Sequence, residues 1–255
     1  MMTLTLISNA GVLLKTPDFR VLVDGIQCEG EFPFSKTPPD LLEEMLSESA
    51  NGICNNLDYL IFSHTHPDHF TPALAAKYLS CNRSLRILFP EVRDDRTECL
   101  FRVISQTGTP YWCFKWNRGA LRTYYLRKTF SVTTLCTRHM PQLFAEDLCN
   151  AVMMTVEGIN ILFLTDCSCG EIELLNCFSK VKIHTVFVNP YFYHDESGRK
   201  FLNEKIHPVN TVVYHIPFAE DDRLGIRSLV RQDAKKYGNK GLILFEEPFQ
   251  ALVIH

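Results

Sequence analysis

The sequence lacks an excess of basic residues and lacks any long apolar run. Its 255 residues carry 26 Lys and Arg against 29 Asp and Glu, which gives a formal net charge of −3. This balance leaves no excess of basic charge to neutralise a phosphate backbone, so dedicated nucleic-acid binding is not favoured. No stretch of the sequence reaches the roughly 18 consecutive apolar residues that a membrane-spanning helix needs. We therefore expect a soluble protein without a membrane partner, for which nucleic acid is an unlikely partner.

The N-terminal residues and the cysteines indicate the compartment. Residues 1–8 have neither the positive charges nor the long apolar core of a signal peptide. Without such a signal, the ten cysteines are expected to be free thiols rather than disulfides. These features predict a cytoplasmic protein. The sequence allows a homo-oligomer but does not specify the oligomeric state.

Segments typical of strands and helices follow one another along the whole chain. Linkers, internal repeats and low-complexity stretches are lacking, so we expect a single domain over residues 1–255. Apolar patterns predict strands at residues 4–7, 11–15, 20–24, 57–63, 86–89, 124–137, 151–156, 160–165, 185–189, 209–215, 241–245 and 250–254, and helices at residues 40–46, 71–79, 171–178 and 226–237. This order fits an α+β sandwich of two sheets with helices on the outer faces. Residues 25–39 and 93–119 are expected to be loops.

One tight turn carries the densest set of side chains that can bind a metal. Residues 64–69 read His-Thr-His-Pro-Asp-His and stand between a predicted strand and a predicted helix. Imidazole nitrogen and carboxylate oxygen suit zinc and similar divalent ions. His64 and His66, at alternate positions, can project to the same side, whereas Asp68 and His69 lie where the turn enters the helix. Because four donors from one turn rarely reach a single ion, the pattern favours two neighbouring metals.

The pattern His-x-His-x-Asp-His after an apolar strand resembles the signature of the metallo-β-lactamase superfamily, whose fold is a four-layer αββα sandwich. The other elements of that family follow in order, and the matching residues are Asp24 at an early strand end, His139 after a long strand, Asp166 after a strand and His215 at a late strand end. The chain departs from the family at Thr165, where glycine is usual. The resemblance covers residues 3–216.

This resemblance implies a dinuclear metal centre. His64, His66 and His139 would hold one ion, Asp68, His69 and His215 the other, with Asp166 bridging them and Asp24 beneath the ligand turn. Zinc is the expected metal, and manganese and iron are alternatives. Two cations lower the pKa of a bound water towards neutrality, so hydroxide would attack a small ester, lactone or phosphodiester. Asp68 would also accept a proton.

Other residues compete for roles near these positions. His207 is an alternative to His215, although it precedes its predicted strand instead of ending it. Cys167 and Cys169 follow Asp166 and could supply a thiolate ligand, but a small buried thiol is the expected state. A loop expected to border the site carries candidate proton donors, which could equally be packing or surface side chains: Tyr191, Tyr193 and His194.

Two alternatives to a hydrolase come from other functional classes. One is a mononuclear iron enzyme that oxidises a sulfur compound, and the other is a non-catalytic metal-binding protein that has kept the fold. His66 stands where the redox-active diiron branch has glutamate, which argues against that branch. The compact layout, without a basic insertion or a helical C-terminal domain of the glyoxalase II type, is similar to lactonase-like cytosolic members. We therefore predict a metal-dependent hydrolase.

Overall fold

The computed structural model describes residues 1–28, 34–47, 52–82, 85–140 and 147–255. Within them the chain divides into two compact units, the first made of residues 1–114 and 247–255 and the second of residues 115–246. Each unit contains one seven-stranded sheet with both parallel and antiparallel neighbours. The expectation of a single domain stays a prediction.

The sheet of the first unit brings two strand ends together at one edge. Its order is β14-β1-β2-β3-β4-β5-β6, with β1 (Met2–Leu6), β2 (Val12–Lys15), β3 (Arg20–Val23), β4 (Tyr59–Ile61), β5 (Arg86–Pro90), β6 (Tyr111–Phe114) and β14 (Ala251–Ile254). Neighbours are antiparallel from β14 to β3 and parallel from β3 to β6. Because β3 and β4 are parallel, Asp24 after β3 and the His-rich turn after β4 lie at the same edge of the sheet.

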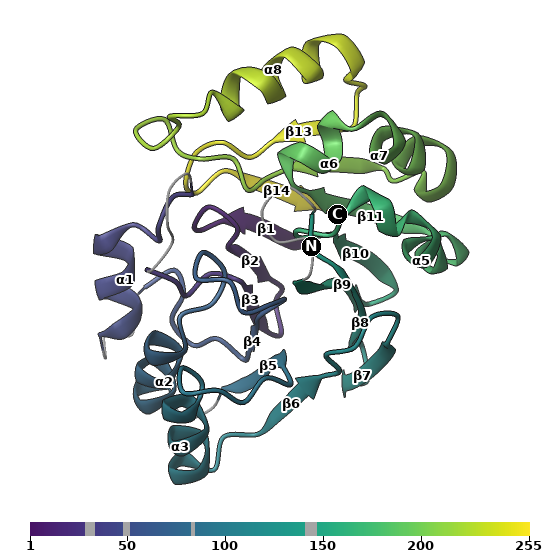
Figure 1. Cartoon of the computed structure of the whole chain (residues 1–255). Helices are drawn as coiled ribbons and strands as arrows, with labels where there is room; N and C mark the ends of the chain where they lie inside the picture. The colour runs from purple at the N-terminus through teal and green to yellow at the C-terminus, as the bar shows by residue number, and fades with distance from the viewer. Residues whose placement is uncertain (29–33, 48–51, 83–84, 141–146) are drawn as a thin grey trace. The chain divides into compact units, whose positions relative to one another are not determined.

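Three helices of the first unit lie along one face of this sheet (Figure 1): α1 (Pro39–Leu46), α2 (Pro72–Cys81) and α3 (Glu98–Thr107). Both α1 and α2 begin with proline, whose fixed φ suits the first helical position. Thr71 precedes α2, but its side chain does not cap the helix; its hydroxyl accepts a hydrogen bond from the backbone N–H of Cys28 at 3.2 Å. The helices bury Leu41, Leu79 and Leu100 against the sheet.

The second unit also brings several strand ends together at one edge of its sheet. The strand order is β13-β12-β11-β10-β9-β8-β7. Its strands are β7 (Leu121–Arg127), β8 (Phe130–Arg138), β9 (Leu148–Val156), β10 (Ile159–Phe163), β11 (Ile183–Val188), β12 (Asn210–Val213) and β13 (Leu242–Leu244). Neighbours are antiparallel from β7 to β10 and parallel from β10 to β13. The residues that follow β10, β11 and β12 therefore meet at one edge.

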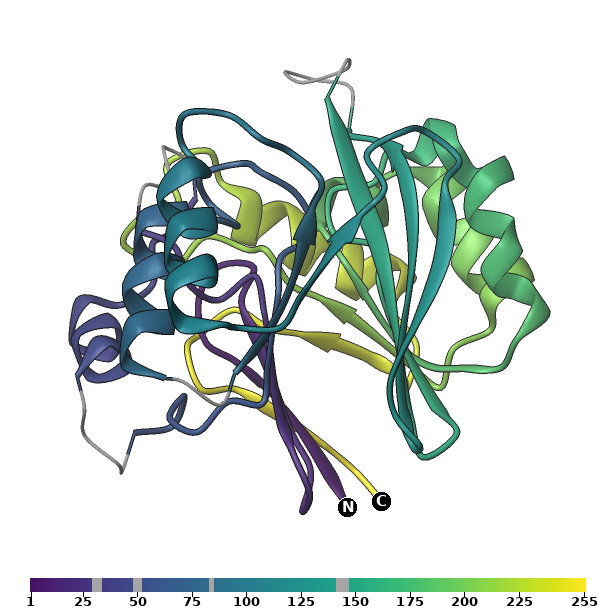
Figure 2. The ribbon, with the colours of Figure 1, turned by 90° about the horizontal axis from the view of Figure 1, so that it is seen from below.

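Helices of the second unit lie beside its sheet (Figure 2): η1 (Cys169–Glu171), α5 (Ile172–Leu175), η2 (Asn176–Lys180), α6 (Pro190–His194), α7 (Glu196–Phe201), η3 (Leu202–Ile206, a π-helix) and α8 (Ile226–Tyr237). Phe192, Leu202 and Val230 from these helices pack with sheet residues such as Leu162 and Val186 in one buried cluster. Most of these helices are short, so their stability comes from this packing and from caps.

Four predicted segments differ from the structure. Residues 93–119 are not one loop, because they contain α3 and β6; Leu100 and Ile104 of α3 are buried one helical turn apart. Residues 124–137 are not one strand, since a turn after Arg127 separates β7 from β8. Residues 171–178 form a broken series of 3-10 and α turns instead of one helix. The segment with Tyr191 is helix α6, not a loop.

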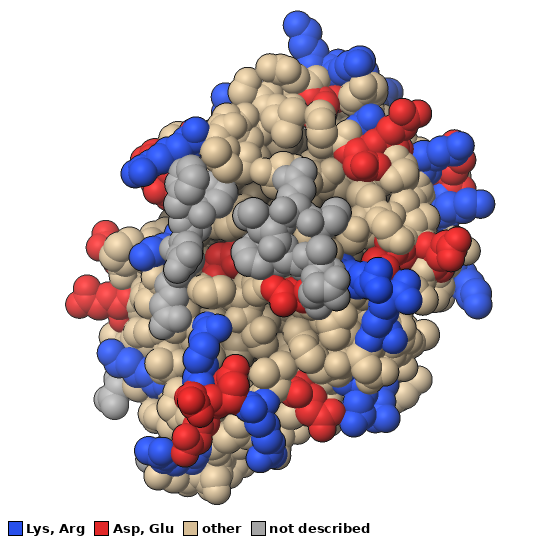
Figure 3. Space-filling view, in the orientation of Figure 1, with Lys and Arg blue, Asp and Glu red and all other residues tan. Residues whose placement is uncertain are grey.

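Acidic and basic side chains are interspersed on the face seen in Figure 3, in keeping with the nearly balanced charge. All ten cysteines are free thiols, as the sequence predicts. Within the described part of the chain, no helix has both the length and the apolar character needed to cross a bilayer.

Candidate metal centre

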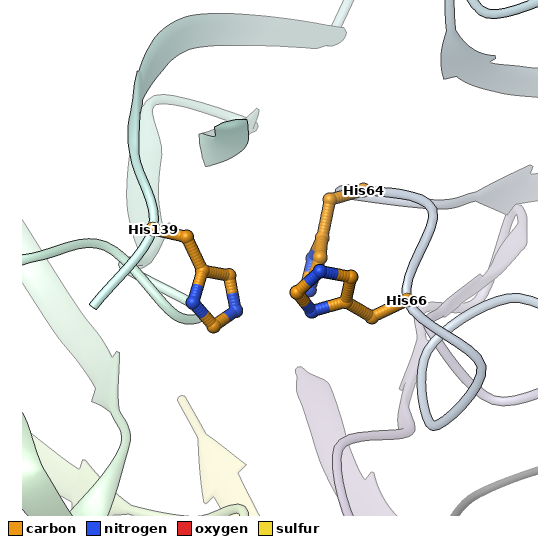
Figure 4. A group of neighbouring side chains, drawn as sticks. All are labelled: His64, His66 and His139. Atoms are coloured by element: carbon orange, nitrogen blue, oxygen red, sulfur yellow. The ribbon is translucent and has the colours of Figure 1, made fainter. Parts of the chain in front are cut away.

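The His-rich turn of the first unit gathers its imidazoles on one side. The ring centroids of His64 and His66 lie 4.7 Å apart, and those of His64 and His69 lie 4.0 Å apart. Figure 4 shows the His64 and His66 side chains leaving the same turn. The backbone N–H groups of His69 and Phe70 both donate to the carbonyl of His66, at 3.0 and 2.9 Å, and so close the turn. His64 and His69 are fully buried, whereas His66 is half-buried.

Asp24 lies beneath this turn and is fully buried. Its carboxylate accepts hydrogen bonds from the backbone N–H of Ser63 at 2.7 Å, from the Ser63 hydroxyl at 2.6 Å and from His69 Nδ1 at 2.9 Å. Since the Ser63 hydroxyl donates to Asp24, its oxygen can accept from His64 Nδ1, which lies 2.9 Å away. One carboxylate therefore fixes the protonated nitrogen of two imidazoles, and the Nε2 atom of each is left with its lone pair.

The orientation of His69 places two acceptor atoms near each other. Its Nε2 lies 3.7 Å from Oδ2 of Asp68, and both side chains are buried. With Nδ1 carrying the proton, neutral Nε2 is an acceptor, as is the carboxylate oxygen. A cation bound to both atoms makes this approach favourable.

A matching arrangement occurs in the second unit around Asp166, which follows β10. Oδ2 of Asp166 lies 3.3 Å from His139 Nε2 and 3.7 Å from His215 Nε2, and all three side chains are buried. His139 follows β8 (Figure 4), and His215 follows β12. His139 Nδ1 lies 3.3 Å from the carbonyl oxygen of Met140, which can only accept a hydrogen bond. Nδ1 of His139 therefore carries the proton, and its Nε2 faces the carboxylate as an acceptor.

Backbone hydrogen bonds join the loops that carry these two residues. The N–H of Met140 donates to the carbonyl of Asp166 at 2.8 Å, and the N–H of Ser168 donates to the carbonyl of Arg138 at 3.1 Å. These bonds flank His139 on both sides. The positions of His139 and Asp166 are thus set together within the second unit.

Three buried residues at or beside these imidazoles have left-handed backbone conformations. Asp24, Thr165 and His215 have φ of 49°, 46° and 60°. Asp and His adopt this region more readily than most residues, but a β-branched residue such as Thr seldom does. Such outliers tend to cluster where the surrounding structure fixes a functional geometry.

Comparison with known proteins gives a fold but no sequence family, because neither a family model nor a curated protein matches the sequence. The chain resembles a structure titled the metallo-beta-lactamase fold protein YhfI from Bacillus subtilis, with a TM-score of 0.61, 17% identity and 98% of each chain covered. It also resembles an isothiocyanate hydrolase from Delia radicum gut bacteria, with a TM-score of 0.66, 15% identity and 99% of each chain covered.

A third similar structure is CmlA, a diiron beta-hydroxylase from Streptomyces venezuelae, with a TM-score of 0.58 and 15% identity. The match covers 99% of this chain but 54% of CmlA, so the chain spans about half the length of that protein. Together with the two mixed sheets, these likenesses decide the architecture. The chain has the metallo-β-lactamase fold. The predicted fold class, α+β of the metallo-β-lactamase type, is confirmed.

Neither His207 nor Cys167 belongs to the groups of possible metal ligands found among the described residues. His207 is exposed and precedes β12, whereas His215 follows it, so the two lie at opposite ends of that strand of the metallo-β-lactamase fold. The Cys167 sulfur accepts a hydrogen bond from the Thr137 hydroxyl at 3.1 Å and lies 3.6 Å from the Cys149 sulfur. Both thiols are buried, as expected for small core side chains.

Burial works against thiolate chemistry at the neighbouring sulfurs. Desolvation raises the pKa of Cys149 well above its usual value, and it raises the pKa of Cys169 to about 12, with a further contribution from Asp195. Cys169 also lies 3.8 Å from the carbonyl of Phe192, to which its thiol can donate. These thiols favour a packing role over metal ligation.

The three candidate proton donors lie on helix α6. His194 Nδ1 is 2.8 Å from Oδ2 of Asp233, and Tyr193 is buried in the core of the second unit. Burial raises the pKa of Tyr193, and burial together with Asp222 raises the pKa of Tyr191. Tyr193 thus packs in the core, and His194, which is exposed, has a hydrogen-bond partner in Asp233. A role in proton donation remains a prediction.

Two residues with site contacts were not singled out from the sequence. The Ser63 hydroxyl forms hydrogen bonds with both Asp24 and His64 and so links the two side chains. Asn189 donates from Nδ2 to the carbonyl of Thr165 at 2.8 Å. Ser63 directly precedes the turn, so adjacency could have suggested it. Asn189 follows a different strand from Asp166, and only the parallel pairing of β10 with β11 brings the two together.

Proposed function

We propose that the two half-sites act together as one dinuclear centre and that the protein is a metal-dependent hydrolase. The first ion would be held by His64, His66 and His139, and the second by Asp68, His69, Asp166 and His215. The family resemblance implies a bridging role for Asp166. Each of these residues offers one donor atom, and all but His66 are buried. Asp24 would orient His69 directly and His64 through Ser63.

The observation that carries this proposal occurs once in each unit. A histidine nitrogen and a carboxylate oxygen, both hydrogen-bond acceptors, lie close to each other. In the first unit Nε2 of His69, which carries no proton, lies 3.7 Å from the Asp68 carboxylate, and in the second Nε2 of His139, also without a proton, lies 3.3 Å from the Asp166 carboxylate. A proton on each ring would be an alternative, but Nδ1 already donates in both cases, so each ring would then be a buried cation. A metal ion satisfies nitrogen and oxygen at once and leaves the imidazoles neutral, as metal ligation requires.

The donor types support zinc as the metal. Five imidazole nitrogens and two carboxylates form a borderline set that suits zinc, and manganese and iron are the alternatives. When bound, the two ions would supply Lewis-acid chemistry that lowers the pKa of water and polarises a substrate oxygen. Asp68, at the mouth of the turn and 7% exposed, would accept the proton that the attacking water loses.

The substrate we propose is a small ester, lactone or phosphodiester. The isothiocyanate hydrolase shows that the same fold serves the hydrolysis of small electrophiles in another protein. Histidine at position 66, where the diiron redox branch has glutamate, supports hydrolysis over oxygen chemistry. The ten free cysteines support the further proposal of a cytoplasmic location.

The test couples metal analysis of the purified protein to a panel of a lactone, a thioester, bis(p-nitrophenyl) phosphate and an isothiocyanate. We expect two divalent ions per chain and turnover of at least one panel member. Asp68→Ala should lower kcat at least about 100-fold, the usual contribution of a positioned proton acceptor. Asp95→Ala, which removes an exposed carboxylate of the same unit, should match the wild type.

The outcomes separate the functional classes. Equal turnover by wild type and Asp68→Ala would refute the mechanism. Two tightly bound ions without turnover of the panel would support the non-catalytic alternative. Bound iron together with oxygen uptake on addition of a sulfur substrate would show that the protein is an oxidising enzyme and not a hydrolase.

A further inference from the structure

The residue before the bridging carboxylate adopts an unfavourable backbone conformation. Thr165 is fully buried and has a φ of 46°, in the left-handed region where the β-branched side chain clashes with the backbone. Such a conformation persists only where the surrounding structure over-determines it. The contacts of Thr165 are therefore informative about what holds Asp166.

Two hydrogen bonds from different strands hold Thr165. Its hydroxyl donates to the carbonyl of Asn150 in β9 at 3.1 Å, and its carbonyl accepts from Nδ2 of Asn189 at 2.8 Å. Asn189 is 1% exposed, and its Oδ1 accepts from the backbone N–H of Phe192 at 2.8 Å, which caps α6. Because one partner can only accept and the other can only donate, the orientation of the Asn189 amide is unambiguous.

The carbonyl that Asn189 binds belongs to the peptide group joining Thr165 to Asp166. A peptide group is planar, so fixing its carbonyl also fixes its N–H and the Cα of Asp166. The side chain of Asp166 leaves that Cα towards His139 and His215, with Oδ2 at 3.3 and 3.7 Å from their Nε2 atoms. A rotation of this peptide would swing the carboxylate away from both imidazoles.

We propose that Asn189 is a positioning residue of the metal centre, which holds the Thr165–Asp166 peptide so that the Asp166 carboxylate stays beside His139 and His215 and would be placed to bind metal. The proposal rests on the dinuclear centre of the proposed function. It does not assign a contact between Asn189 and metal or substrate. Asn189 links three elements of the second unit, since it follows β11, caps α6 and holds the loop after β10.

The test compares the metal affinity of Asn189→Ser and Asn189→Asp with that of the wild type, by titrating the metal-free proteins with zinc against a chromophoric chelator. Both variants keep an oxygen that can cap α6, and both lose the amide donor. We expect the affinity for zinc to fall roughly 10–100-fold, as for other residues that orient a ligand. In Asn189→Asp the added negative charge would by itself strengthen cation binding, so weaker binding there points to the lost donor.

Asn160→Ser is the matched control. Asn160 lies in β10, the strand that leads to Asp166, and its Nδ2 donates to the carbonyl of Lys182 at 2.9 Å. The same amide-to-carbonyl bond is thus removed at the opposite end of the strand. We expect Asn160→Ser to bind zinc as tightly as the wild type.

Testing Asn189→Ser in the Thr165→Gly protein separates a role in positioning Asp166 from a role in the stability of the whole protein. Glycine adopts the left-handed conformation without strain, so in Thr165→Gly the loop needs less support. The loss of zinc affinity caused by Asn189→Ser should shrink to a few-fold in the Thr165→Gly protein, because residues that act through one peptide are non-additive. An equal loss in both backgrounds would overturn the link through Thr165.

The remaining outcomes distinguish the two proposals. If the wild type binds no divalent ion, the proposed function fails. If the wild type binds two ions and both Asn189 variants bind them with unchanged affinity, the positioning role fails while the proposed function stands. The melting temperature of each metal-free variant shows whether it is folded, and Asn189→Asp serves should Asn189→Ser not fold.

Discussion

Replacing Asp24 by Asn tests how the first unit orients its imidazoles. The substitution keeps the size and shape of the side chain, and Asn tolerates the left-handed backbone at φ 49° as well as Asp does. Oδ1 can still accept from the N–H of Ser63, but an NH2 group now stands where Oδ2 accepted from the Ser63 hydroxyl and from His69.

The expected cost follows from these contacts. The Ser63 hydroxyl can reorient and accept from the new NH2 group, whereas the His69 Nδ1 proton loses its partner. One buried hydrogen bond to a charged group is lost, which lowers the free energy of unfolding by about 1.5–3 kcal/mol. Neutral His69 can avoid two facing donors by moving its proton to Nε2, and that tautomer cannot bind a metal through Nε2. We therefore expect zinc affinity to fall roughly 10–100-fold.

Urea unfolding of the metal-free protein gives the free energy of unfolding, and zinc titration against a chelator gives the affinity for zinc. Asp58→Asn is the control, because Asp58 stands just before β4 in the same unit and accepts a hydrogen bond from the backbone N–H of Arg20 at 3.0 Å. That variant should lose some stability and keep its zinc affinity. If Asp24→Asn binds zinc as the wild type does, Asp24 does not set the His69 tautomer.

Three further predictions address the metal, the core and the thiols. Removal of metal by a chelator should abolish turnover and lower the melting temperature, and added zinc should restore both, since an ion that binds only the folded state stabilises it. Phe163→Ala should lower the free energy of unfolding by about 3–5 kcal/mol in urea, because its buried ring stacks on Phe187 at 4.5 Å; a loss below 1 kcal/mol would contradict this packing. In the native protein at pH 8, a thiol reagent should modify exposed Cys81 first and leave Cys136, whose pKa burial raises to about 12, unmodified until unfolding; mass spectrometry locates the label.

Local patterns in the sequence predicted an α+β chain and the His-rich ligand turn, and the resemblance to a known family implied the layered fold and the remaining candidate ligands. The turn at residues 64–69 places four donors within six positions, so neighbours in the chain are also neighbours in space. Helix α8 was predicted with its observed bounds, and the bounds of most other predicted elements differ from the observed ones by one to three residues. Helix α3 was missed although Leu100 and Ile104 stand one helical turn apart, whereas α6 has only five residues and so offers little periodicity.

Only the tertiary structure decided how the isolated residues Asp24, Asp166 and Asn189 are used. Each follows a strand, and the sequence does not state which strands are neighbours or which are parallel. The parallel pairing of β3 with β4 sets Asp24 under the His-rich turn, and that of β10 with β11 sets Asn189 on the peptide before Asp166. The proton positions on the imidazoles follow from those contacts, because a histidine tautomer is fixed by the partner of its other nitrogen.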